Sequence, residues 1–286
     1  MLRIVLLLAG AALLGALLWR LGPSEVLDAL GRIRWYFLPV LGLGGAHQMV
    51  RALALRACVL RAGVLRYRDA LAIRLSGEAI QSLTFTGPLL AEPTKAWLLA
   101  RLGLTLREGF AATITEYLIY TLVTAVMSMA GLLYLIARFD VTGTPRGIAI
   151  GIVCVCAAFL VASAVAIARR FYLIGTIIAW LASIGVLRGR LTPDMTWINQ
   201  MEDLLLIVLR DSPVRFAMIA AIEIAAQALL VVELFWLLRA LGVMASGWSA
   251  FVIMAPANVV WISFTRSCFG HVGAGNASGS MAKSIL

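Results

Sequence analysis

The sequence predicts an all-α polytopic membrane protein with about six transmembrane helices, a re-entrant broken helical hairpin and surface amphipathic helices. Three observations support this class. Of the 286 residues, 62% are hydrophobic and 13% charged, with a mean hydropathy of +0.98, against about 45–50% and about 25% in soluble domains. Apolar runs of bilayer length recur along the chain. Finally, no polar stretch approaches the ~50 residues of a soluble domain, so residues 1–286 are expected to form a single integral membrane domain.

Six apolar runs are the predicted spans, each near the length that a helix needs to cross the bilayer. They cover residues 4–19, 35–55, 111–137, 147–168, 216–238 and, in a shorter run, 249–264.

The first run resembles a signal sequence, because Arg3 precedes it, but no small-residue cleavage pattern stands before Arg20. We therefore expect it to remain as the first span. Residues 171–187 are apolar too, but their flanks favour a helix on the membrane surface. If these residues formed one more span, the membrane orientation of every later span would be inverted.

Arginine placement predicts the orientation. The segments 51–74 and 169–215 are rich in arginine, whereas the opposite connections carry few basic residues. Positively charged loops stay in the cytoplasm, so the N-terminus is expected there, in a multi-pass protein of the bacterial cytoplasmic (inner) membrane. The net charge of +10 mostly reflects this bias and also suits anionic lipid headgroups. No basic nucleic-acid-binding module is present, so no nucleic-acid partner is expected.

Two segments have the pattern of amphipathic surface helices. Residues 23–33 carry apolar side chains on one face, and so do Leu204, Leu205, Val208 and Leu209 within the polar stretch 188–215. Such helices either sense lipids or act as connectors that shield their neighbours.

The segment 75–97 contains Glu78, Glu92 and Lys95 within a sequence that is otherwise apolar enough to lie in a membrane. An ionisable side chain at bilayer depth costs several kcal/mol unless it faces protein or water, so such residues are candidates for a functional site. Glu92 and Lys95 are three positions apart and can pair across one helical turn. The plainer alternative is that they only neutralise each other at the interface.

Two prolines predict that this segment is a broken hairpin over about 70–100. Pro88 pushes the residue before it out of the α region, so residues 84–91 are expected to be irregular. Pro93 suits the first position of a new helix, which places Glu92 near the N-cap. Basic residues on both sides favour entry and exit on the cytoplasmic side.

The hairpin tip would present Thr84, Thr86, backbone amides and the positive end of a helix dipole, which suits a lipid phosphate.

Glu116 lies near the start of the third span. It either pairs with Lys95 or with an arginine of 51–74, or its carboxylate snorkels to the interface. The candidate substrate-binding residues are Glu78, Thr84, Thr86, Pro88, Glu92, Lys95 and Glu116.

Other polar residues give weaker signals. Glu223 and Gln227 share a helix face, whereas Glu233 points elsewhere and is expected at the interface. His47 is either a packing residue or a proton relay. With His47 and His271 alone, neither a catalytic triad nor a two-histidine zinc site can be assembled, and no nucleotide-binding loop is present. We expect no enzyme activity, catalytic residue, metal or cofactor.

The motif Pro88-Leu-Leu-Ala-Glu92-Pro-Thr-Lys95 resembles the lysylphosphatidylglycerol synthase transmembrane family, whose members are flippase-like. Gly77-Glu78 precedes it and Thr115-Glu116-Tyr117 follows it, with Glu116 matching the acidic residue of the next span. The similarity covers most of the chain. It implies a polytopic helical fold with two re-entrant segments and a role in handling amphiphilic lipids. The family's soluble aminoacyl-transfer domain has no counterpart here, so the resemblance implies no synthase activity.

The C-terminal part departs from the family pattern. A second proline-glycine-acid motif is usual there, but Asn276 stands where a glutamate is common. Residues 249–286 are therefore expected to form a degenerate second re-entrant segment, altered or truncated.

Two functions remain open from the sequence. The first is a flippase-like protein that binds or translocates a lipid or lipid-linked anionic substrate. The second is a non-catalytic membrane subunit that partners a lipid- or glycan-modifying enzyme.

Overall fold

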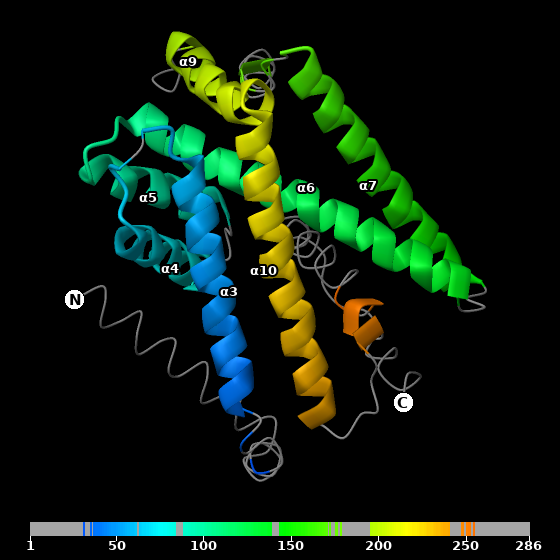
Figure 1. Ribbon diagram of the computed structural model, residues 1–286. Helices are drawn as coiled ribbons and strands as arrows, with labels where there is room; N and C mark the ends of the chain where they lie inside the picture. Colours follow the sequence, from blue (N-terminus) through cyan, green and yellow to red (C-terminus); the bar gives the residue numbers. More distant parts are fainter. Residues whose placement is uncertain are drawn as a thin grey trace, which may run out of the picture.

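The computed structural model describes residues 37–61, 63–83, 88–138, 143–170 and 195–240, with residues 31, 35, 172, 175, 176, 178, 247, 248, 250–252 and 254 (Figure 1). The described chain forms eight helical elements and no strand, which confirms the all-α class. Several predictions fall outside this part: the span at 4–19, the hydroxyls Thr84 and Thr86, and most of 23–33, 171–187 and 249–286.

Three of the described helices are long and apolar enough to cross a membrane. They are α6 (Leu106–Arg138), α7 (Thr144–Ala168) and α10 (Pro213–Ala240), and they correspond to the predicted spans at 111–137, 147–168 and 216–238. With 33 residues, α6 is about 50 Å long at 1.5 Å per residue, which exceeds a ~30 Å hydrocarbon core. It crosses the bundle obliquely relative to α10 (Figure 1).

The predicted span at 35–55 is the helix α3 (Phe37–Cys58), which lies along α10 (Figure 1). Its 22 residues suffice for a crossing, but it is not among the three helices that are also apolar enough. The reason is its polar content, since Arg51 and His47 lie within it and both are buried.

The broken hairpin consists of α4 (Tyr67–Leu83) and α5 (Pro88–Arg101), which pack against each other and are separated by four residues. The predicted start of the second helix at Pro93, with Glu92 near the N-cap, is wrong. The helix begins at Pro88, where the missing N–H removes no helical hydrogen bond, and Pro93 lies inside it. Residues 88–91 are therefore helical rather than irregular.

The connections on one end of the bundle are tied together by side-chain contacts. Arg61, just after α3, donates to the Gly103 carbonyl at 3.2 Å and pairs with Glu108 at 2.9 Å. Arg170, just after α7, pairs with Asp211, two residues before α10, at 3.1 Å. Arg215, at the start of α10, donates to the Val59 carbonyl at 3.4 Å. The two arginine-rich segments therefore meet at the same end, where α7 ends and α10 begins. We call this the arginine-rich end.

The predicted amphipathic stretch is α9 (Met195–Leu206), continued by the π-helical turn η2 (Ile207–Asp211). Its apolar face is buried in the protein, because Ile198 and Met201 are inaccessible and α9 packs on α6. Trp197 meets Phe110 of α6 edge-on, with ring centroids 5.8 Å apart. Of the two alternatives, this packing supports the connector rather than the lipid sensor.

Close contact between α5 and α6 depends on a glycine. A Cβ atom built on Gly109 would lie 2.6 Å from the carbonyl oxygen of Ala96, closer than side chains approach in real structures. Because the obstacle is backbone, it cannot rotate away. Gly109 therefore sets how closely the hairpin approaches the longest helix.

We predict that Gly109→Ala destabilises the protein. Overpacking of this kind costs about 1–3 kcal/mol, although alanine is otherwise favoured over glycine in helices. Thermal unfolding in detergent, followed by size-exclusion chromatography, measures the effect. The control is Gly151→Ala in α7, where nothing lies within 4 Å of the new atom. Equal melting temperatures for Gly109→Ala and the control would contradict this packing.

Candidate functional site

Five helices contribute charged side chains to one buried cluster, which we call the ionic cluster. Its members are Arg51 from α3, Arg74 and Glu78 from α4, Glu92 and Lys95 from α5, Glu116 from α6 and Glu223 from α10. Lys95, Glu116 and Glu223 have at most 1% of their surface exposed. A buried charge is tolerated only when it is paired and hydrogen-bonded, so each of these residues depends on its partners in the cluster.

Glu116 is the centre of the ionic cluster. Its Oε1 accepts from Arg51 Nη2 at 2.9 Å and from Arg74 Nη1 at 3.3 Å, and its Oε2 accepts from Lys95 Nζ at 2.8 Å. One carboxylate thus connects α3, α4, α5 and α6. The two predicted alternatives, pairing with Lys95 or with an arginine of 51–74, both hold, and snorkelling to the interface is wrong.

Lys95 bridges two carboxylates. Besides Glu116, its Nζ lies 2.8 Å from Oε1 of Glu92. Its side chain passes directly over Gly77 of α4, where an added Cβ would lie 2.8 Å from the lysine chain. The predicted Glu92–Lys95 pair is confirmed, but the alternative that they only neutralise each other at the interface is wrong, because Lys95 is fully buried and also bound to Glu116 of α6.

Arg51 connects Glu116 to the last carboxylate of the ionic cluster. Its Nε lies 3.4 Å from Oε2 of Glu223, and its guanidinium sits 4.0 Å from the ring centroid of Tyr120. A guanidinium over an aromatic face gains cation–π attraction. Arg51 is thereby held between α6 and α10.

Glu78 forms the rim of the ionic cluster. It pairs with Arg74 one turn earlier on α4, at 3.2 Å, and 37% of its side chain is exposed. The predicted site residues Glu78, Glu92, Lys95 and Glu116 are therefore brought together. Pro88 begins α5, and nothing is described of its side chain.

The ionic cluster lies well inside the bundle. Glu116 is ten residues into α6 and Glu223 ten residues into α10, both counted from the arginine-rich end. At 1.5 Å per residue this is about 15 Å of helix, comparable to half of a ~30 Å hydrocarbon core.

Sequence reasoning missed Arg51, Arg74 and Glu223 as members of the site. An arginine of 51–74 was expected as one possible partner of Glu116, but neither Arg51 nor Arg74 was named as a site residue, although Arg51 falls inside the predicted span 35–55. An arginine within a span is itself a signal for a functional or paired residue. Glu223 was noted for sharing a face with Gln227, and that face is indeed buried: Gln227 donates to Thr124 of α6 at 3.0 Å.

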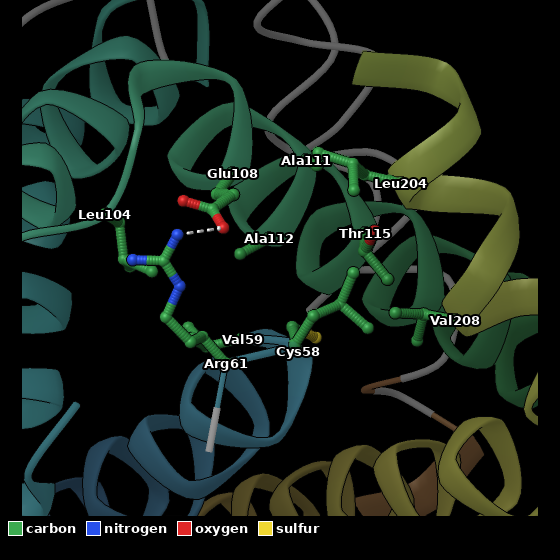
Figure 2. Close-up of a pocket in the computed structure, with 11 residues that line it drawn as sticks. Cys58, Val59, Arg61, Leu104, Glu108, Ala111, Ala112, Thr115, Leu204 and Val208 are labelled. Atoms are coloured by element: carbon green, nitrogen blue, oxygen red, sulfur yellow. Dashed lines mark hydrogen bonds and ion pairs between the residues drawn. The ribbon is translucent and has the colours of Figure 1, made fainter. Parts of the chain in front are cut away.

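A separate hollow opens at the arginine-rich end, between the end of α3, the start of α6 and α9 (Figure 2). It is partly open to solvent and has room for about one water molecule. Leu104, Ala112 and Val208 line it, and the exposed Arg61–Glu108 pair stands at its edge. No member of the ionic cluster lines this hollow. Across the described residues, no group of three or more metal-ligating side chains occurs.

We predict that Glu116→Gln costs about 3–5 kcal/mol of stability. The substitution leaves three buried cations without their shared carboxylate, and breaking a buried ion pair from one side costs about that much. The matched control is Glu108→Gln on the same helix, whose pair with Arg61 is exposed and contributes ~1 kcal/mol or less. Thermal unfolding in detergent compares the two. A Glu116→Gln protein as stable as the control would refute the central role of Glu116.

Comparison with known proteins places the chain in one family. The family model described as the lysylphosphatidylglycerol synthase TM region matches residues 2–266, which is most of the chain. No curated protein and no solved structure matches. The match covers the hairpin and all the residues of the ionic cluster.

Proposed function

The chain belongs to the lysylphosphatidylglycerol synthase TM region family, and on that premise we propose that it is a flippase-like membrane protein that binds or translocates a lipid or lipid-linked anionic substrate at the ionic cluster. The observation that carries the proposal is Lys95, a fully buried cation in the second helix of a broken hairpin, bound to carboxylates of two helices.

The hairpin geometry supports a re-entrant segment. Its two helices have 17 and 14 residues, about 25 and 21 Å, which is short for a full crossing. Tyr67 opens the hairpin soon after Arg61, and Arg101 closes it just before the Gly103 carbonyl that Arg61 contacts. Entry and exit therefore lie at the arginine-rich end. Discontinuous helices of this kind mark substrate sites in transporters.

The charges suit a phosphate-bearing headgroup. Lys95, Arg74 and Arg51 converge on one carboxylate, and a phosphate presents the same paired oxygens with one shared negative charge. If the phosphate of a headgroup displaced Glu116 or Glu92, the cations would exchange one anionic partner for another and would remain paired. Exposed apolar side chains of the hairpin itself, Leu75, Leu89 and Leu90, provide a surface for the acyl region.

The proposed setting is the bacterial inner membrane with the arginine-rich end in the cytoplasm. The meeting of both arginine-rich segments at one end supports this orientation, because the positive-inside bias requires them to share a side.

A second candidate is a non-catalytic membrane subunit that partners a lipid- or glycan-modifying enzyme. It is favoured by the fact that each cation of the ionic cluster is already paired within the chain, so the cluster can also serve a purely structural role. Co-purification with an enzyme, together with no lipid movement by the protein alone, would support this candidate.

We predict that Lys95→Ala and Glu92→Gln each slow lipid movement in proteoliposomes. Fluorescent anionic lipid is placed in both leaflets, and its loss to an external quencher is followed. A lost charge-assisted hydrogen bond weakens binding by about 1.5–3 kcal/mol, so a roughly ten- to hundredfold reduction is expected.

The controls keep the helix and the chemistry of each change. Arg101→Ala removes an exposed cation of α5, which stacks on Trp97. Glu108→Gln neutralises a partly exposed carboxylate of α6 that lies outside the ionic cluster. Both should retain wild-type rates. If Lys95→Ala and Glu92→Gln retain them too, the proposed site is excluded.

A further inference from the structure

Glu223 differs from the other buried carboxylates of the ionic cluster. Glu116 accepts hydrogen bonds from three cations, and Glu92 has Lys95 at 2.8 Å. Glu223 is fully buried, yet neither of its oxygens has a hydrogen-bond partner among the described residues. Its one ionic contact is Arg51 Nε at 3.4 Å. It is the carboxylate least compensated for the loss of water.

The buried charges of the cluster balance without a ligand. Three buried cations, Arg51, Arg74 and Lys95, face three carboxylates: Glu116 and Glu223, which are fully buried, and Glu92, which is 12% exposed. Glu78 stands at the rim with 37% of its side chain exposed, so it is not counted among the buried charges. An arriving phosphodiester would add one unpaired negative charge to a water-poor interior, which is unfavourable. A proton that arrives with it restores the balance.

We propose that Glu223 takes up one proton when the ionic cluster binds a phosphodiester monoanion, so that binding is linked to pH. This inference rests on the proposed function. The proton goes to a carboxylate oxygen of Glu223 as the anion pairs with the cations, and it leaves when the anion leaves. The transfer is an acid–base step and needs no redox partner.

The surroundings of Glu223 single it out as the group that titrates. From α3 it faces Arg51. His47, one turn earlier on α3, is buried too, but it lies toward the part of the helix whose Gly44 is next to Glu233. From α6 it faces Glu116 and Tyr120, both engaged with Arg51.

The remaining charges packed against α10 are remote from Glu223. Those of η2, Arg210 and Asp211, are exposed at the arginine-rich end, where Asp211 pairs with Arg170. On α10 itself, Arg215, Glu233 and Arg239 are eight or more residues away. The pair Glu223–Arg51 is therefore the place where a proton changes the charge of the cluster with least disruption.

The test is calorimetric binding to the full chain in detergent, in two buffers of different ionisation enthalpy, from about pH 6 to about pH 9. The probe is dihexanoylphosphatidylglycerol, a soluble lipid with one net negative charge. We expect uptake of about one proton, with affinity falling about tenfold per pH unit above the linked titration. Dihexanoylphosphatidylcholine, which is net neutral, should bind without proton uptake.

Glu223→Gln, which is neutral at every pH, should bind the anionic probe with no proton uptake and no pH dependence. Glu233→Gln on the same helix lies outside the ionic cluster and should behave as wild type. If Glu223→Gln does not fold, binding of the anionic probe by the wild type without proton uptake still overturns the proposal. The deacylated headgroup glycerophosphoglycerol, if bound with the same proton uptake, supports the coupling and identifies the free phosphodiester as sufficient.

Two results would overturn the proposal while leaving the proposed function intact: anionic lipid binding without proton uptake in the wild type, or unchanged uptake in Glu223→Gln. Failure to bind any probe at any pH would instead remove the proposed function, and this inference with it.

Discussion

The arrangement depends on one carboxylate that has no access to water. Glu116 can remain charged inside the bundle only because Arg51, Arg74 and Lys95 reach it from three other helices. Each of these cations is costly to bury by itself, so the four charged side chains can be buried only together, where their charges compensate one another. This mutual requirement fixes the hairpin α4–α5 against α3 and α6. Helices in a bilayer gain little from apolar contact with each other, which makes such polar contacts a strong determinant of how they assemble.

The contacts of the ionic cluster require close backbone approach, and small residues provide it. Gly77 leaves room for the Lys95 chain, and Gly109 brings α6 onto the Ala96 carbonyl. The broken hairpin contributes in the same way, because its second helix, α5, brings Lys95 to Glu116 in the interior. Peripheral elements are held differently: α7 contacts α6 and keeps an exposed apolar surface, while α9 closes the arginine-rich end through its buried face.

Much of this arrangement could be predicted from composition and local pattern. Hydropathy located α6, α7 and α10 to within a few residues. Charged residues and prolines within an otherwise apolar segment indicated the hairpin and its residues Glu92 and Lys95, together with Glu116. The predicted start of α5 was wrong because both Pro88 and Pro93 suit the first position of a helix, and the helix begins at Pro88. The sequence did not identify which arginines of 51–74 meet Glu116, or that Glu223 joins them, because these contacts link helices up to about 170 residues apart. Periodicity along one helix carries no information on such pairs.

The central claim is that a lipid headgroup reaches the buried carboxylate–lysine pair rather than only the outer surface of the bundle. Photolabelling with an anionic lipid that carries a diazirine beside its phosphate tests this most directly, with labelled positions mapped by mass spectrometry. The account predicts labels on α4, α5 and α6 around Glu92, Lys95 and Glu116, which an excess of unlabelled lipid removes. Labels confined to lipid-facing positions such as those of α7, unchanged by competitor, would contradict it.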